Sequence, residues 1–271
     1  MKVTLAKYGG FCIGVKRALN IVESAPNPCI LGYLVNNDRV MERLKSKGVN
    51  IVSSVGEAGE KPIVISASST LKSNYEALAS KPYYDATCRV VFRCVEIAKR
   101  SQIEGKTLVI IGEKDHLEVK NVASFADKVE YILTEKEAEE FTFSKSKGYI
   151  VITQTTFPKA RAEYIYSLLK TKANENVEFV FTLCDSVRKR VEEAVENAKT
   201  HEKVLVVGDS KSANCRFLYN AALEVNPQTY FIESADFISE GFTAESVFVT
   251  GGASVDPEDI KEVVRKLVTR E

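Results

Sequence analysis

The sequence predicts an α/β protein built from three related units, each with a small parallel sheet. Strand-like apolar segments alternate with helix-like segments along the chain, and this alternation is typical of parallel α/β structure. The same order of elements occurs three times, which indicates an internal repeat. In every repeat one apolar segment ends in a glycine, and these glycines are Gly32, Gly112 and Gly208.

Each repeat begins with a cysteine that leads into a charged, amphipathic helix. The cysteines are Cys12, Cys88 and Cys184, and the segments that contain them are FCIGVKRALNIVES, TCRVVFRCVEIAKRS and LCDSVRKRVEEAVENA. Apolar residues recur in these segments at helical spacing, so each helix is expected to turn one apolar face to a sheet. The strand that ends in glycine follows each helix at a similar interval.

A second helix and two further strands complete each repeat. The helix-like segments are RVMERLKSKG, EVKNVASFA and CRFLYNAALEV, and short apolar strands follow them as VNIV, VEYIL and TYFI. The last strand runs into hydroxyl-rich residues, in IVISASST, YIVITQTTF and VFVTGGAS. The predicted units cover residues 1–85, 86–180 and 181–271, and we expect a pseudo-threefold axis to relate them around a central site.

The composition is that of a soluble globular protein with a substantial core. The 271 residues are 45% hydrophobic and 27% charged, and 37 basic side chains balance 37 acidic ones. This balance gives no indication of a nucleic-acid partner. The first ten residues lack the apolar run of a signal peptide, and no later segment reads as a membrane span. We therefore expect a cytoplasmic protein without a membrane or nucleic-acid partner.

Six cysteines in a reducing compartment favour metal binding, catalysis or burial over disulfide bonds. Thiolates at three electropositive helix starts suit an anionic iron–sulfur cluster. Such clusters are usually held by four cysteines, so three ligands would leave one iron open. Zinc with His116 as a fourth ligand is a second interpretation, and three buried thiols without a metal are a third. Cys29 and Cys94 are predicted core residues, whereas Cys215 fits either the core or the pocket.

Polar residues follow the predicted strands at matching positions in all three repeats. Parallel sheets place their binding sites at the carboxyl ends of the strands. Beyond the strand-ending glycines lie Asn36, His116 and Ser212, and beyond the late strands lie Ser68, Thr155 and Ser254. These positions predict a polar pocket at the centre of the repeat, with the cysteines at one end. Glu118 follows His116 closely, and the two predict a proton-handling pair.

Several motifs, taken in order along the chain, are similar to those of one enzyme family. They are GFCIGVKRAL, VNNDRVMERLKSKGV, DATC, HLEV, TQTT, the S-A-N of SKSANC and the final GAS. With them, essentially the whole chain resembles the LytB (IspH) family of 4-hydroxy-3-methylbut-2-enyl diphosphate reductases. The resemblance implies α/β domains around a [4Fe-4S] cluster with three cysteine ligands and one open iron. It also implies reductive removal of a hydroxyl group from an allylic diphosphate, which gives isopentenyl and dimethylallyl diphosphates for isoprenoid synthesis.

The resemblance further implies roles for individual residues. The cluster ligands would be Cys12, Cys88 and Cys184. Glu118 would deliver protons to the leaving hydroxyl, and Thr155 would orient that hydroxyl and relay the proton. The diphosphate would be held by Asn36, Ser68, His116, Ser212, Asn214 and Ser254. A ferredoxin or flavodoxin would be the electron donor.

Two of these positions depart from the family pattern. Asn36 and Ser68 stand where the family has histidines, and the chain has only two histidines in all. Their loss removes charge that a buried diphosphate needs, because a buried anion without partners is unfavourable. The candidates to replace this charge are Arg89, where the family has proline, Lys72 and Lys211.

The sequence therefore supports several functional hypotheses. The family reaction is favoured because Ser212, Asn214 and Ser254 are retained, and a paralogous iron–sulfur reductase with a less anionic substrate is the main alternative. A cluster-bearing redox sensor or carrier would not need Glu118 and Thr155. A zinc hydrolase is the remaining hypothesis, and metal analysis separates it from the others.

Overall fold

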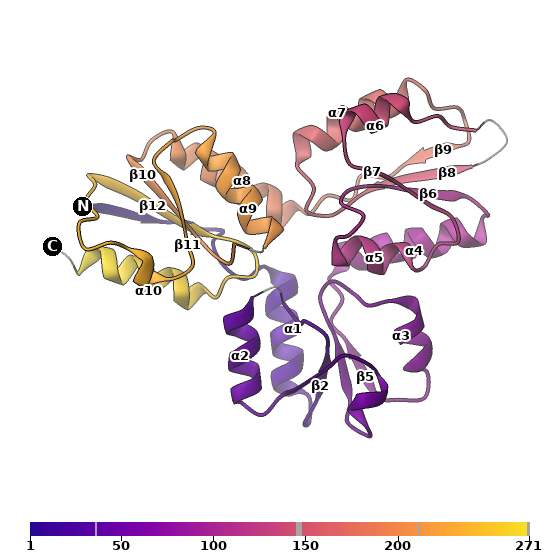
Figure 1. Ribbon diagram of the computed structural model, residues 1–271, viewed down its shortest axis with the longest axis horizontal. Coiled ribbons are helices and arrows are strands. Elements are labelled where there is room, and N and C mark those ends of the chain that lie inside the picture. The colour runs from indigo at the N-terminus through magenta and orange to yellow at the C-terminus, as the bar shows by residue number, and fades with distance from the viewer. Residues whose placement is uncertain (36, 145–147, 211, 270–271) are drawn as a thin grey trace. The chain divides into compact units, whose positions relative to one another are not determined.

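The computed structural model of the chain describes residues 1–35, 37–144, 148–210 and 212–269. Across these residues it contains three four-stranded sheets in which every strand pairing is parallel (Figure 1). The chain divides into two compact units. The first comprises Met1–Arg17, Val35–Gly48 and Asp185–Glu271, and the second comprises Ala18–Leu34 and Val49–Cys184.

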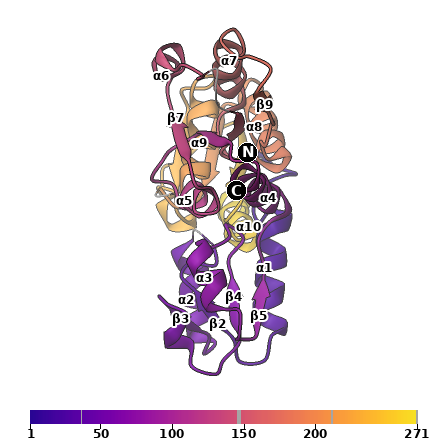
Figure 2. The same cartoon turned by 90° about the vertical axis from the view of Figure 1, so that its right-hand side faces the viewer.

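The second unit contains two of the sheets, and the shorter one has the strand order β3-β2-β4-β5 (Figure 2). Its strands are β2 (Cys29–Leu31), β3 (Asn50–Val52), β4 (Ile63–Ile65) and β5 (Tyr83–Asp85). The inner strands β2 and β4 are apolar and buried at every residue, whereas the edge strands β3 and β5 are partly exposed. The short helix α3 (Lys72–Ala77) lies between β4 and β5, and the 3-10 turn η1 (Gly56–Ala58) precedes β4.

The other sheet of this unit has the order β7-β6-β8-β9 and a core on each face. Its strands are β6 (Thr107–Ile111), β7 (Val129–Ile132), β8 (Tyr149–Thr153) and β9 (Val177–Phe179). Successive side chains of a strand point to opposite faces. Leu108 and Ile110 therefore pack with α4 (Arg89–Ile103) and α5 (Leu117–Ala123). Val109 and Ile111 pack with α6 (Glu135–Glu140) and α7 (Lys159–Lys170) on the other face (Figure 1).

The sheet of the first unit follows the same plan, with the order β11-β10-β12-β1. Its strands are β1 (Lys2–Leu5), β10 (Lys203–Val207), β11 (Thr229–Ile232) and β12 (Ser246–Gly251). Val204, Val206 and Phe248 pack with α8 (Asp185–Ala198) and α9 (Ala213–Leu223). Leu205, Val207 and Val249 pack with α10 (Pro257–Val268) on the opposite face, where the 3-10 turn η2 (Ala235–Phe237) also contributes Ala235.

Two further helices come from the first third of the chain. The opening segment of the first compact unit ends at Arg17, which lies inside α1 (Ile13–Ser24). The residues of this helix are therefore divided between the two units. The helix α2 (Asp38–Ser46) belongs to the first unit and begins at an N-cap, Asn37, whose side chain accepts a hydrogen bond from the Val40 N–H. Among the described residues, no helix is both long and apolar enough to cross a membrane.

The predicted α/β class with small parallel sheets is confirmed. The strand pairing adds one feature that the repeat did not predict, because the N-terminal strand β1 pairs with β12 of the last repeat. Each sheet thus ends in the strand that precedes a cysteine: β5 precedes Cys88, β9 precedes Cys184 and β1 precedes Cys12. The unit borders near residues 85 and 180 stay a prediction.

Candidate functional site

The three predicted ligand cysteines occupy equivalent positions in their sheets. Each lies between an edge strand and the first residue of a long helix, α1, α4 or α8. The backbone N–H of each cysteine donates to a carbonyl two residues beyond the inner strand that neighbours this edge strand. These hydrogen bonds join Cys12 to Ala253 (3.0 Å), Cys88 to Ala67 (3.0 Å) and Cys184 to Thr155 (2.8 Å). The repeat therefore extends to the backbone contact that places each thiol.

These cysteines differ from the others in exposure. Cys12, Cys88 and Cys184 are partly exposed, whereas Cys29, Cys94 and Cys215 are buried. The Cys12 sulfur accepts the N–H of Val15 in the first turn of α1, at 3.4 Å. Cysteine sulfur is a common ligand of metals and iron–sulfur clusters, so these partly exposed residues are chemically suitable as ligands. Within the part of the chain that the structure describes, no three His, Cys, Asp or Glu side chains gather to hold a metal ion.

The loop before Cys12 is held by two charged residues of α8 that sequence reasoning missed. Glu193 accepts the N–H groups of Lys7 (2.7 Å) and Tyr8 (3.0 Å). Arg190, only 5% exposed, donates to the Gly10 carbonyl at 2.6 Å. A hydrogen bond of this kind, which involves a charged group, contributes roughly 1.5–3 kcal/mol to the free energy of unfolding. Nothing in the amphipathic pattern of α8 distinguishes these two residues from its solvated charges.

The loop before Cys184 is held by the inner strand of its own sheet. The Thr182 hydroxyl donates to the Thr153 carbonyl at 2.6 Å and accepts the Thr153 N–H at 2.9 Å. The Tyr166 hydroxyl donates to the Val180 carbonyl at 2.8 Å. The hydroxyl-rich end of β8 therefore holds in place the segment of the chain that leads to Cys184.

Glu118 and Thr155, which were predicted to share the proton chemistry, are in direct contact. One carboxylate oxygen of Glu118 accepts the Thr155 N–H at 2.7 Å, and the other accepts the Thr155 hydroxyl at 2.7 Å. Both residues are buried, with 6% and 5% of their surface exposed. Glu118 lies in the first turn of α5. The two side chains form one buried, hydrogen-bonded unit.

His116 is the N-cap residue of α5, directly beside this unit. Its Nδ1 atom is buried and has no hydrogen-bond partner among the described residues. A buried polar atom of this kind is unfavourable unless a partner binds to it. The proton-handling pair of His116 and Glu118 stays a prediction. The buried Nδ1 atom can form a hydrogen bond with a ligand.

The remaining cysteines are explained by packing. Burial, with Glu118 as a smaller cause, raises the pKa of the Cys94 thiol to about 12, so this thiol is neutral. Cys215, which the sequence left open, is a core residue with no measurable exposure. A Cβ atom at Gly208 or Gly252 would lie 2.5 Å and 2.2 Å from its sulfur, so both positions require glycine. The predictions for Cys29 and Cys94 as core residues are confirmed.

The predicted substrate residues of the first unit lie at the carboxyl ends of its strands. The Ser212 hydroxyl caps α9 by accepting the Cys215 N–H at 3.4 Å, and Asn214 lies in the first turn of that helix. The Ser254 carbonyl accepts the Asn37 amide at 2.9 Å. Asn36 and Lys211 lie outside the described residues, so the structure places neither of them.

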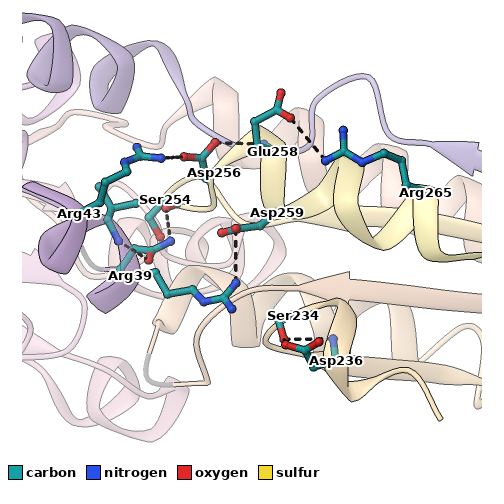
Figure 3. A network of polar contacts seen from close by, with 11 residues as sticks. Arg39, Arg43, Ser234, Asp236, Ser254, Asp256, Glu258, Asp259 and Arg265 are labelled. Atoms are coloured by element: carbon teal, nitrogen blue, oxygen red, sulfur yellow. Dashed lines mark hydrogen bonds and ion pairs between the residues drawn. The ribbon is translucent and has the colours of Figure 1, made fainter.

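Ion pairs reinforce the contact between α2 and the segment after β12 (Figure 3). Arg43 pairs with Asp256 at 2.5 Å and Arg39 pairs with Asp259 at 3.4 Å. Burial raises the pKa of Asp259, and the charge of Arg39 offsets part of that shift. The start of α2 is thereby fixed beside Ser254, a predicted substrate residue.

A cavity of about 170 Å³ opens next to these ion pairs, in the first unit. Its lining residues are Asn37, Asp38, Arg39, Gly208, Asp209, Glu233, Val255 and Asp259. Gly208, Glu233 and Val255 all follow strands of the sheet, so the cavity lies at the carboxyl edge, as parallel sheets require. Four acidic side chains and one arginine line it, and this balance is poorly suited to an anion.

Of the candidate cations for the lost histidine charge, two can be placed. The Lys72 ammonium lies 3.4 Å from the Gln102 side-chain oxygen, so it contacts α4. Arg89 is the exposed first residue of α4 and directly follows Cys88.

Asn121 is a further polar residue of α5 that the sequence analysis did not predict. It follows Glu118 by three residues, and this helical spacing could have indicated that the two share a face of the helix. It donates to the carbonyls of Ser68 and Ser69, both at 3.1 Å.

Known proteins match almost the whole chain. One relative from Campylobacter hominis is 32% identical, with 99% of each chain covered, and bears the name 4-hydroxy-3-methylbut-2-enyl diphosphate reductase. Another of the same name, from Fusobacterium nucleatum subsp. nucleatum, is also 32% identical over 98% of this chain. The chain spans about a third of that relative's length, since 34% of it is covered.

Solved structures agree with these matches. An (E)-4-hydroxy-3-methyl-but-2-enyl diphosphate reductase, described as the terminal enzyme of the non-mevalonate pathway, superposes with a TM-score of 0.73. It is 26% identical and covers 99% of this chain and 100% of its own. The E-1-hydroxy-2-methyl-but-2-enyl-4-diphosphate reductase of Plasmodium falciparum has the same fold, with a TM-score of 0.89, 21% identity and 98% and 88% coverage. A family model described as LytB protein matches residues 3–268, and the chain belongs to the LytB family.

Proposed function

We propose that this chain reduces 4-hydroxy-3-methylbut-2-enyl diphosphate to isopentenyl and dimethylallyl diphosphates with the help of a [4Fe-4S] cluster. The reaction breaks the carbon–oxygen bond of the allylic alcohol, consumes two electrons and two protons, and releases water. The observation that carries the proposal is the equivalence of Cys12, Cys88 and Cys184, whose N–H groups make the same backbone contact at three helix starts. The relatives of this chain bear the name of this activity.

The proposed ligands are Cys12, Cys88 and Cys184, each of which directly precedes a long helix. When bound, the cluster would supply single electrons and a Lewis-acidic iron without a cysteine ligand. The protein contributes partly exposed thiols at electropositive helix starts. Zinc is the less favoured occupant, because structural zinc sites usually draw on close cysteine pairs such as CxxC, whereas these cysteines lie 76 and 96 residues apart.

The protein would supply protons through Glu118 and Thr155. Once protonated, Glu118 would pass its proton to the Thr155 hydroxyl, 2.7 Å away, while that hydroxyl orients the leaving hydroxyl and gives its own proton to it. Protonation makes the departing group water instead of hydroxide. A redox sensor or electron carrier would have no use for this buried unit, so its presence favours an enzyme.

Substrate binding would combine uncharged donors with His116. The donors would be Asn36, Ser68, Ser212, Asn214 and Ser254, and the Nδ1 atom of His116, which has no partner in the described part of the chain, would also bind the diphosphate. Arg89, at the start of α4, would supply the charge that Asn36 and Ser68 lack. A ferredoxin or flavodoxin in the cytoplasm would deliver the electrons.

One observation favours a second candidate, a paralogous reductase with a less anionic substrate. The cavity beside Gly208 and Val255 is lined by Asp38, Asp209 and other carboxylates, with one arginine. A diphosphate near this edge of the sheet meets repulsion unless a cation accompanies it. The two candidates share the cluster and the proton donor and differ in the charge of the substrate.

Single cysteine variants test the ligand set. We expect C12A, C88A and C184A each to lose nearly all iron after anaerobic reconstitution, because a cluster with two cysteines is labile. C94A and C215A are the matched controls and should retain about four iron atoms per chain, since both thiols are core residues. Iron analysis and visible absorbance measure the outcome. Zinc in place of iron, or equal iron loss in the controls, would contradict the proposed cluster.

A Glu118→Gln variant tests the proton donor. The amide preserves the size of the side chain but cannot deliver a proton, so kcat should fall on the order of 10²–10⁴-fold while the iron content stays constant. Glu113→Gln, an exposed change in the loop that leads to the same helix, is the control and should keep full activity. Turnover by E118Q within threefold of the parent chain, roughly the scatter of such assays, would remove Glu118 from the mechanism.

An Arg89→Ala variant separates the two candidate substrates. If Arg89 binds the diphosphate, KM should rise about tenfold or more, because a hydrogen bond to a charged group is lost. Inhibition by inorganic diphosphate should weaken in parallel. Arg93→Ala, one turn further along α4 and equally exposed, is the matched control. Unchanged KM and unchanged inhibition in R89A would show that Arg89 does not bind the diphosphate and would favour the paralogous reductase.

A further inference from the structure

The hydroxyl of Tyr75 lies where two segments with predicted site residues meet. Tyr75 belongs to α3, and its ring packs edge-on against Phe125 with ring centroids 5.7 Å apart. The hydroxyl oxygen lies 3.0 Å from a carboxylate oxygen of Asp85, 3.2 Å from the Ser69 hydroxyl and 3.3 Å from the Thr87 hydroxyl. One side chain thus joins the segment before Cys88 to the loop that contains Ser68.

The first contact fixes the backbone that enters α4. Tyr75 donates its proton to one carboxylate oxygen of Asp85, and the other oxygen accepts the Thr87 N–H at 2.8 Å. Thr87 immediately precedes Cys88, whose own N–H donates to the Ala67 carbonyl. Burial raises the pKa of Tyr75, so the hydroxyl keeps its proton and remains a donor at neutral pH.

The second contact stabilises an unusual backbone conformation. Ser69 has a φ of +67°, in the left-handed region that residues other than glycine seldom adopt. Such a conformation persists only where the surroundings hold it. The Ser69 carbonyl accepts the Ser66 hydroxyl and the Asn121 amide, both at 3.1 Å, and the Ser69 hydroxyl contacts Tyr75. The conformation sets the direction of Ser68, its neighbour.

Asn121 connects the same loop to the helix of the proposed proton donor. This residue of α5 is 3% exposed and also donates to the Ser68 carbonyl at 3.1 Å. Glu118 lies on the same helix, so the Ser68 loop and the carboxyl group share one rigid support. A change at Tyr75 therefore loosens the loop on one side while Asn121 still holds it on the other.

We infer that Tyr75 is a positioning residue, whose single hydroxyl sets both the placement of Cys88 and the conformation of the Ser68 loop. Its effect on catalysis rests on the proposed function, but its effect on the two segments does not. Phenylalanine at this position keeps the ring and removes only the hydroxyl. The three polar groups around it then lose a shared partner.

Hydrogen exchange of the metal-free chain tests the placement directly. In Y75F we expect amides in residues 66–70 and 85–88 to exchange about fivefold faster or more, as the loss of one buried hydrogen bond predicts. Tyr164→Phe, an exposed change on α7, is the matched control and should leave both segments unaltered. Unchanged exchange in Y75F would overturn the inference. So would equal acceleration across residues 49–184, because that indicates general destabilisation.

A second change separates the two contacts. Glycine adopts a φ of +67° without strain, so S69G in the Y75F background should slow exchange in residues 66–70 and leave residues 85–88 fast. In the reconstituted enzyme, Y75F should raise KM and alter the EPR spectrum of the reduced cluster. S69G should restore KM but not the spectrum.

Two results tell the proposals apart. A return to slow amide exchange in both segments of the Y75F/S69G double variant would contradict separate contacts and overturn the inference. A parent chain that takes up no iron would instead contradict the proposed function. The exchange measurements alone would then decide whether Tyr75 positions the two segments.

Discussion

The backbone hydrogen bond from each cysteine to the carbonyl beyond an inner strand is the contact on which the rest of the site depends. It requires a parallel sheet, because only parallel strands end together at one edge. It also requires the edge strand before each cysteine, and at the N-terminus that strand is β1, paired with β12. The same chain path thus places a thiol at a helix start three times, although the side chains that hold each loop differ.

Those supporting side chains show how one architecture tolerates different sequences. Arg190 and Glu193 hold the loop before Cys12, Thr182 and Tyr166 hold the loop before Cys184, and Tyr75 holds the segment before Cys88. In the first two loops these side chains bond to backbone groups, whereas Tyr75 acts through the carboxylate of Asp85. Under the proposed function, the buried contact between Glu118 and Thr155 would add acid chemistry to this frame.

Sequence patterns predicted the parts of this account that depend on periodicity. The continuous apolar run of Leu108–Ile111 and the glycine-ended strands indicated the sheets, and the recurring cysteines indicated the helix starts. Contacts between distant segments left no such trace. The pairing of β1 with β12, the Arg190 contact to Gly10 and the hydroxyl of Tyr75 depend on tertiary packing that a local pattern does not record. Cys215 was ambiguous for the same reason, since only the close approach of Gly208 and Gly252 makes it a core residue.

The central claim is that three cysteines bind one cluster whose fourth iron is left for the substrate. Mössbauer spectroscopy of the ⁵⁷Fe-labelled protein, before and after addition of 4-hydroxy-3-methylbut-2-enyl diphosphate, tests it most directly. The account predicts one iron site distinct from the other three, with parameters that change when the substrate is added. Four equivalent irons that do not respond to the substrate, or a protein that binds zinc and no iron, would contradict it.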